Sequence, residues 1–217
     1  MKFKTLGTIL KKSKRAVILE REIGWSGSRR VVQQYISNGF AAYPVYGLPR
    51  LDKVMLLTIM DIPADQWSDW WVSIKDVPSS MNFTDIDEQE ERLTDFYGEI
   101  TVNGTPLRPV GTAHNGLVLV NPEFIKPLED VAKNGIETYL RYTPDNSPYL
   151  AVKSGLLVQA IIMPVSVTKS LYENLRELTA RCLTQLMTGE LPNRGIIDMD
   201  QLGAPEEQGE EEGADNG

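Results

Sequence analysis

The chain has little of the chemistry on which most enzymes depend. Its 217 residues include one cysteine, Cys182, and one histidine, His114. One cysteine excludes an internal disulfide framework, and this pair cannot supply the ligands of ordinary zinc sites or a closely spaced Cys-His dyad. His114 falls in a stretch, 111–116, that is typical of a loop, so we expect it to be solvated rather than catalytic. The sequence predicts no catalytic residue, no metal and no cofactor.

Motifs for nucleotides and membranes are also missing. Neither a GxxxxGK[ST] phosphate-binding loop nor a GxGxxG turn after a strand is present. The carboxylates between residues 85 and 91 could bind a divalent metal in an enzyme, but their crowding in a polar stretch favours a solvated surface. No run approaches the ~20 apolar residues that span a bilayer, and the N-terminus lacks the apolar core of a signal peptide. We expect a non-enzymatic cytoplasmic protein without a membrane partner.

Charge is distributed unevenly along the chain. Residues 1–30 carry nine basic and two acidic side chains, whereas residues 198–217 carry eight acidic side chains and no basic one. The acidic end has almost no apolar content and cannot bury enough surface to fold, so residues 191–217 are predicted to form a disordered tail. Such a tail usually serves solubility; the alternative is that it mimics nucleic acid or shields a basic surface.

The basic N-terminus predicts an amphipathic helix. The apolar side of its helical projection contains Phe3, Leu6, Ile9 and Leu10. Several lysines and arginines on the opposite side can contact phosphates and release counterions from a duplex. The alternative is a solvated face that balances the acidic body of the protein. The residues that we expect to bind duplex DNA are Lys4, Lys11, Lys12 and Arg15.

Residues 116–167 predict a strand, a helix and three further strands. The helix is expected over 121–133, because Asn121 suits an N-cap and Pro122 suits the first helical position. Pro127 removes a backbone hydrogen bond, so this helix should be kinked or start late. The three strands that follow are expected at 137–142, 149–153 and 156–165.

The same order of elements is predicted near the N-terminus. After the first helix, strands are expected at 16–22, 29–36 and 40–46, with a hairpin signal at Ser37-Asn38-Gly39. A helix followed by three strands therefore occurs twice, at 5–46 and at 121–165. This repeat is one of elements and not of residue identities.

The block at 116–167, with its capped helix and its closing Met163-Pro164, resembles the final half-domain of a DNA sliding clamp. Sliding clamps, such as the bacterial DNA polymerase III beta subunit and PCNA-like factors, are ring-shaped processivity factors. The resemblance implies a clamp-like α+β fold of two helix-plus-β-meander halves, a homo-oligomer, duplex DNA as ligand and a polymerase or other replication protein as partner. It also implies a partner-binding pocket at Met163, Pro164 and Val165, for which core packing is the alternative.

The remaining segments depart from the clamp pattern. The predicted domains are a first half at 1–50, an insertion or connecting segment at 51–111, a second half at 112–167, a C-terminal helix at 168–190 and the tail at 191–217. The inserted segment holds three tryptophans, which belong to the core or a domain contact, or to a partner site if they are exposed. These tryptophans are Trp67, Trp70 and Trp71.

The C-terminal helix and the helix at 121–133 suggest a rival function. The C-terminal helix has one apolar face, on which Cys182 is expected to be a small buried residue. Acidic residues balance the lysines on the helix at 121–133, whereas a ring around DNA would favour two cationic helices. The rival to a DNA-associated processivity or tethering factor is a structural or protein-interaction protein of a mobile element or phage that does not hold DNA.

Overall fold

The computed structural model describes residues 2–95, 98–102, 104–111, 117–133, 135–166 and 168–188. The chain divides into two compact units, Met1–Ser166 and Val167–Gly217. The first unit contains a large mixed sheet, a smaller sheet and short helices, so the α+β class predicted from the sequence is confirmed. His114 and the predicted tail at 191–217 lie outside the described residues.

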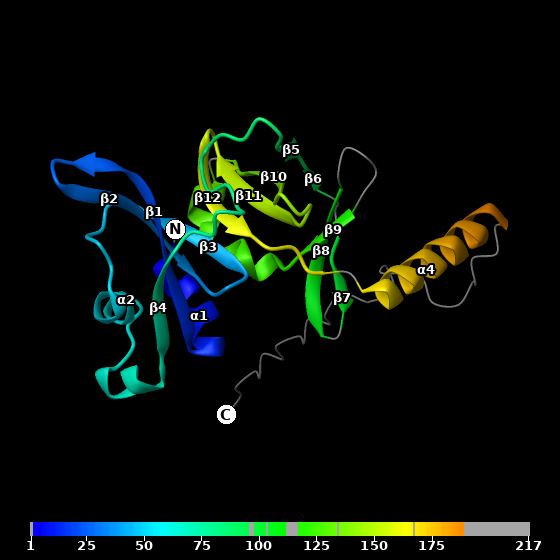
Figure 1. Cartoon of the computed structure of the whole chain (residues 1–217). Coiled ribbons are helices and arrows are strands. Elements are labelled where there is room, and N and C mark those ends of the chain that lie inside the picture. Colours follow the sequence, from blue (N-terminus) through cyan, green and yellow to red (C-terminus); the bar gives the residue numbers. More distant parts are fainter. Residues whose placement is uncertain are drawn as a thin grey trace, which may run out of the picture. The chain divides into compact units, whose positions relative to one another are not determined.

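The helices and strands of the first unit follow one another in the order shown in Figure 1. The helical elements are α1 (Phe3–Ser13), α2 (Lys53–Ile59), η1 (Ala64–Asp69), η2 (Pro122–Phe124), η3 (Lys126–Leu128) and α3 (Glu129–Ala132). The strands of the large sheet are β1 (Arg15–Ser26), β2 (Arg29–Ser37), β3 (Ala41–Val45), β4 (Trp71–Asp76), β5 (Glu91–Arg92), β10 (Glu137–Tyr142), β11 (Pro148–Ser154) and β12 (Leu157–Ile162). The smaller sheet contains β6 (Thr94–Asp95), β7 (Ile100–Val102), β8 (Thr105–Gly111) and β9 (Leu117–Val120).

The large sheet joins the two predicted meanders edge to edge. Its strand order is β4-β1-β2-β3-β12-β11-β10-β5. The first meander meets the second where β3 pairs antiparallel with β12, with Ala42 opposite Ile161. The strand order is therefore symmetric about the junction between β3 and β12, because three consecutive strands lie on each side of this junction. One further strand extends each edge: β4 pairs parallel with β1, and β5 pairs antiparallel with β10.

Local sequence explains the turns of the first meander. Lys14 adopts a left-handed conformation (φ 51°) and ends α1, and its N–H donates to the carbonyl of Leu10. The predicted hairpin at 37–39 forms as expected, because the Asn38 side chain accepts hydrogen bonds from the backbone N–H of Phe40 (2.9 Å) and Ala41 (2.8 Å). β1 extends beyond its predicted end to Ser26 through a bulge near Glu22.

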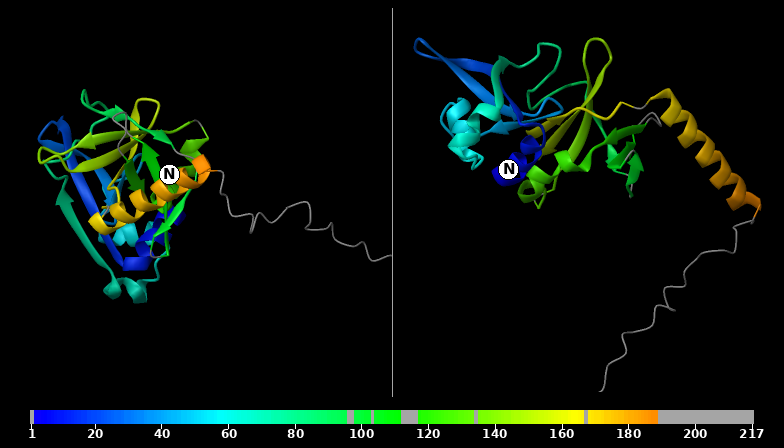
Figure 2. Two further views of the ribbon diagram at one scale, coloured as in Figure 1. Left: turned by 90° about the vertical axis from the view of Figure 1, so that its right-hand side faces the viewer. Right: turned by 90° about the horizontal axis from the view of Figure 1, so that it is seen from below.

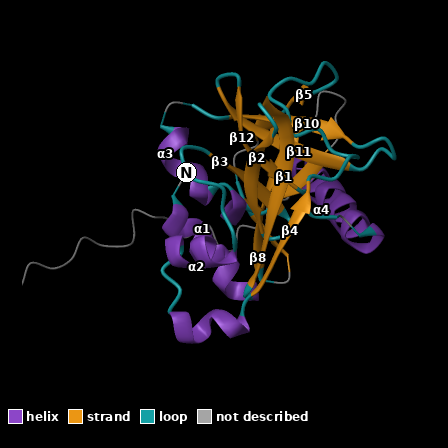
Figure 3. Ribbon diagram, turned by 60° about the vertical axis from the view of Figure 1, so that its left-hand side comes forward, coloured by secondary structure: helices purple, strands orange, loops and turns teal. Residues whose placement is uncertain are grey.

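The six central strands of the large sheet, β1, β2, β3, β12, β11 and β10, send alternate side chains to two apolar clusters. On one face, which we call the helix face, residues such as Ile18, Ile36 and Leu150 pack with buried residues of α1 and α2. Figure 3 shows α1, α2 and α3 together on this face. On the other, which we call the loop face, Tyr35 and Ala151 pack with apolar residues of the segment 77–90. One face of the sheet is therefore covered by helices and the other by a loop.

The helix predicted over 121–133 is wrong as a single helix. Asn121 does cap its start, because its side-chain oxygen accepts from the N–H of Glu123 at 2.9 Å. The chain then forms η2, η3 and α3 in succession instead of one continuous helix. Pro127 lies within η3 and cannot donate the backbone hydrogen bond that an uninterrupted helix requires there. The carbonyl of Pro127 instead accepts a hydrogen bond from the N–H of Lys2 (2.8 Å), next to α1.

The segment 77–90 is anchored to the loop face by a buried arginine. Arg141 is 1% exposed, and its guanidinium donates to the carbonyls of Asn82 and Thr84, both at 2.9 Å. It also donates to Glu90 Oε2 from Nε (3.0 Å) and from Nη2 (2.6 Å). The Lys153 ammonium makes a further ion pair with Glu90. Glu90 is therefore not part of a solvated surface, as the composition suggested, but the counterion of two buried cations.

The second unit contributes the helix α4 (Lys169–Thr188) to the described residues. Near its start, the N–H of Leu171 donates to Thr168 Oγ1 at 3.2 Å. None of its residues is buried, so the expectation of a buried Cys182 is wrong: this thiol is exposed. The helical periodicity predicts this helix, but periodicity alone does not reveal whether a partner covers the apolar face. Along the described chain, no helix is both long and apolar enough to cross a membrane.

Candidate peptide pocket and cationic helix

The four cations predicted to bind DNA lie at or next to α1, but in different surroundings. Lys4, Lys11, Lys12 and Arg15 are all exposed. Lys4 and Lys11 make no ion pair with any residue that the structure describes. These two ammonium groups are therefore available to a phosphate without the loss of a protein contact.

Acidic residues of the second helical segment neutralise other lysines of the same surface. Lys2 Nζ lies 3.0 Å from Glu129 Oε2 and 3.4 Å from Asp130 Oδ1, and Lys12 pairs with Glu123. The hydrogen bond with Glu129 raises the pKa of Lys2 above its ordinary value. Figure 2 shows α1 beside the segment that carries these acids. The acidic side chains of the segment 121–133 thus face α1 and reduce the positive charge of this surface.

Arg15 lies at the start of β1, next to the edge strand β4. Its guanidinium lies 5.9 Å from the ring centroid of Trp71, and Lys75 Nζ lies 5.8 Å from the same ring. Trp71 is half exposed, whereas Trp70 is buried in the core, and Trp67 donates from Nε1 to the carbonyl of Ile62 at 2.8 Å. The tryptophan cluster therefore divides between core packing and an exposed ring that contacts two cations.

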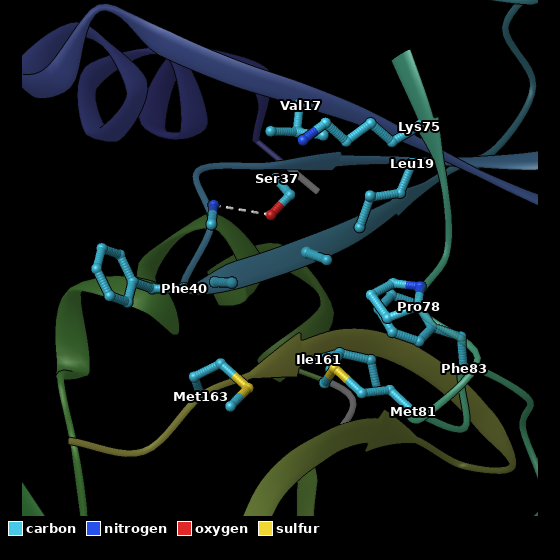
Figure 4. Close-up of a pocket in the computed structure, with 13 residues that line it drawn as sticks. Val17, Leu19, Ser37, Phe40, Lys75, Pro78, Met81, Phe83, Ile161 and Met163 are labelled. Carbon is cyan, nitrogen blue, oxygen red and sulfur yellow. Dashed lines mark hydrogen bonds between the residues drawn. The ribbon is translucent and has the colours of Figure 1, made fainter. Parts of the chain in front are cut away.

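An apolar cavity of about 350 Å³ opens on the loop face of the large sheet. We call it the Met163 pocket. Its floor is the loop face of β1, β3 and β12, and its wall is the segment 77–90, as Figure 4 shows. Ser37 and Lys75 are the polar side chains among the lining residues, and Ser37 Oγ accepts from the N–H of Gly39 at 2.9 Å. The apolar lining residues are Val17, Leu19, Phe40, Ala41, Ala42, Pro78, Met81, Phe83, Ile161 and Met163.

The three residues predicted to bind a partner peptide have different positions. Met163 lines the pocket and is half-buried, and its N–H donates to the carbonyl of Phe40 at 2.7 Å. Figure 4 shows the Met163 and Met81 side chains on either side of Ile161. Pro164 and Val165 do not line the pocket; the Val165 N–H donates to the carbonyl of Leu119 at 2.8 Å, which joins this segment to β9.

The wall of the pocket could not be assigned from the sequence. Met81 and Phe83 are isolated apolar residues in a polar stretch, and this isolation was the only available signal. In the structure they contact the sheet, with the Phe83 ring edge-on to Tyr35 at 5.0 Å between centroids. Tyr149 Oη accepts the N–H of Asn82 at 2.8 Å, and this hydrogen bond also holds the wall against the sheet. The pocket is therefore bounded by a fixed surface.

The chain has no match among the known proteins with which it was compared: no family model, no curated protein and no solved structure matches it. Within the described residues, no group of three or more His, Cys, Asp or Glu side chains is placed to hold a metal ion. The arrangement of the Met163 pocket and of α1 is therefore the basis for a functional proposal.

Proposed function

We propose that this chain is a non-enzymatic tethering protein that captures an extended peptide segment of a partner protein in the Met163 pocket. The observation that carries the proposal is an apolar cavity on a sheet face that is otherwise closed by a well-anchored loop. A cavity of about 350 Å³ is within the size range of ligand sites, roughly 300–1,000 Å³. Apolar side chains of a peptide would fill it and remove both surfaces from water.

The composition of the lining supports a peptide as the occupant. Two methionines, Met81 and Met163, contribute flexible and polarisable side chains that adapt to ligands of differing shape. Arg141 and Tyr149 hold the backbone next to Met81, and the N–H of Met163 donates to the carbonyl of Phe40, so the pocket does not have to be ordered when the ligand binds. A preformed apolar surface with adaptable side chains suits the capture of a short apolar segment.

Selection of phage-displayed random peptides on the full chain tests this function. Enriched peptides are synthesised with a fluorophore, and their affinity is measured by fluorescence anisotropy. Met163→Ala removes a half-buried side chain from the pocket, so we expect binding to weaken about tenfold, which corresponds to ~1.4 kcal/mol. Met187→Ala is the matched control, because Met187 is 87% exposed on α4. Failure to enrich peptides, or equal affinity of wild type and Met163→Ala, would contradict the proposal.

A second candidate function is that the tether also associates with duplex DNA, as a clamp-like processivity factor would. Exposed Lys4 and Lys11, which have no carboxylate partner among the described residues, favour it. The symmetric strand order of the large sheet and the placement of helices on one face are consistent with the same candidate. The ion pairs of Lys2 and Lys12 count against it, because they lower the charge that would face phosphates.

A further inference from the structure

Beside the Met163 pocket lies an arginine, Arg21, that has no hydrogen-bond or ion-pair partner among the described residues. Arg21 is half-buried on β1, and its Nε atom is buried without a hydrogen-bond partner. Its side chain makes neither a hydrogen bond nor an ion pair with any described residue. Buried polar atoms are nearly always hydrogen-bonded, because leaving one unsatisfied costs about 1–3 kcal/mol. Arg21 is thus a cation in need of an acceptor.

The position of Arg21 connects it to the pocket. It lines a second cavity of about 310 Å³, which we call the Arg21 groove. The two cavities share lining residues from the segment 77–90, namely Pro78, Met81 and Phe83. Along β1, Val17 and Leu19 line the Met163 pocket and Arg21 follows on the same side of the strand. An extended peptide that leaves the pocket along β1 would therefore reach Arg21.

The other charges of the Arg21 groove are already paired. Arg30 lies 2.9 Å from Glu22 and 3.0 Å from Asp76, so one guanidinium binds both carboxylates. The remaining acid of the lining, Glu20, accepts hydrogen bonds from Arg50 at 2.8 and 2.7 Å. Arg21 has no carboxylate left to bind within this groove. The lining thus holds three carboxylates and two guanidinium groups, and Arg21 is the guanidinium whose Nε has no acceptor among the described residues.

We infer that the partner segment carries an Asp or Glu side chain next to its apolar residues, and that Arg21 binds this carboxylate while the Met163 pocket takes the apolar side chains. This inference rests on the proposed function and names the chemistry of the partner. Arginine presents several N–H donors to the two oxygens of a carboxylate, which gives a strong and oriented hydrogen bond. The groove continues past Arg21 to Arg30 and Asp76, so it leaves room for the chain to run on; this favours a side-chain carboxylate over a C-terminal one.

Peptide display on the full chain, repeated with two arginine variants, tests the inference. Peptides selected on the wild type should be enriched in Asp or Glu beside apolar residues. Arg21→Gln should weaken a selected peptide about tenfold, the loss of one charge-assisted hydrogen bond. Changing the acidic residue of that peptide to its amide should weaken binding to the wild type by a similar factor and leave Arg21→Gln unaffected. Arg29→Gln is the control, because Arg29 is exposed and lines neither cavity.

The outcomes separate this inference from the proposed function. Arg21→Gln should fold with an unchanged melting temperature, since Arg21 gives up no hydrogen bond, and Arg21→Lys should restore part of the affinity. Peptides that depend on Met163 but show no acidic preference would overturn the role of Arg21 and leave the pocket intact. A C-terminal amide that abolishes binding would also overturn it, because the carboxylate would then be terminal. If no peptide is enriched, both proposals fail.

Discussion

Neutralisation of Glu90 should destabilise the protein strongly. Its carboxylate pairs with Arg141, whose side chain is 0% exposed, and with Lys153, whose side chain is 7% exposed. Glu90→Gln keeps the size of the side chain but removes the carboxylate partner of Lys153 and leaves Arg141 with Asp87 alone, whose Oδ2 lies 3.8 Å from Arg141 Nε. Loss of one partner of a buried ion pair costs about 3–5 kcal/mol of unfolding free energy. Because the amide oxygen of glutamine can still accept a hydrogen bond from Arg141, we expect a loss at the lower end of this range, about 3 kcal/mol.

Urea denaturation at neutral pH measures this loss as a lower midpoint with an unchanged slope. Glu177→Gln is the matched control, because Glu177 pairs with Arg181 on the exposed surface of α4, where such a pair contributes about 0.5 kcal/mol or less. The same Arg141 donates to two carbonyls of the pocket wall, so Glu90→Gln should also weaken peptide binding. A loss below about 1 kcal/mol would refute the view that Glu90 holds the segment 77–90 on the sheet.

Two further predictions concern pH and DNA. The hydrogen bond from Arg50 lowers the pKa of the buried Glu20 carboxyl. The stability that this carboxylate contributes is therefore present above the unfolded-chain pKa of about 4.3 and is lost as pH falls through the lower pKa of the folded protein. In urea denaturation, the difference in unfolding free energy between wild type and Glu20→Gln should be larger at pH 7 than at pH 3, and an equal difference would contradict this. If Lys4, Lys11 and Arg15 each contact one phosphate, the affinity for duplex DNA measured by anisotropy should fall about 40-fold between 50 and 200 mM salt. Replacing all three residues by Glu should abolish binding. If the wild type does not bind duplex DNA at ~50 mM salt, the DNA candidate is excluded.

Local signals in the sequence were sufficient for the turns and strands of both meanders. Asn38 and Asn121 act through short-range hydrogen bonds to their own backbone neighbourhood, so their roles follow from spacing alone. The parallel pairing of β4 with β1 brings Arg15 opposite Trp71 across more than fifty residues of sequence, and no local pattern encodes it. Pro127 was recognised as an obstacle to the helix, but whether it would produce a kink or separate short turns depended on packing against α1.

The candidate site was predicted only in part, because it too depends on contacts between segments that are distant in the sequence. Met163 was identified through its resemblance to a clamp pocket residue, and it does line a cavity. Pro164 and Val165 do not line it, and Val165 instead pairs with Leu119 of β9 in the smaller sheet. The wall of the pocket depends on Arg141, a charged residue in a strand, whose burial becomes understandable only when its partner Glu90 is known.

Methyl NMR of the full chain, with its methionines labelled and assigned by substitution, tests the central claim most directly. The probe is a peptide selected by display on the wild type. Binding in the pocket should shift the methyl signals of Met81 and Met163, which line it, and leave that of Met187 on α4 in place. Shifts confined to Met187, or a bound peptide that moves neither pocket methionine, would contradict peptide capture by the Met163 pocket.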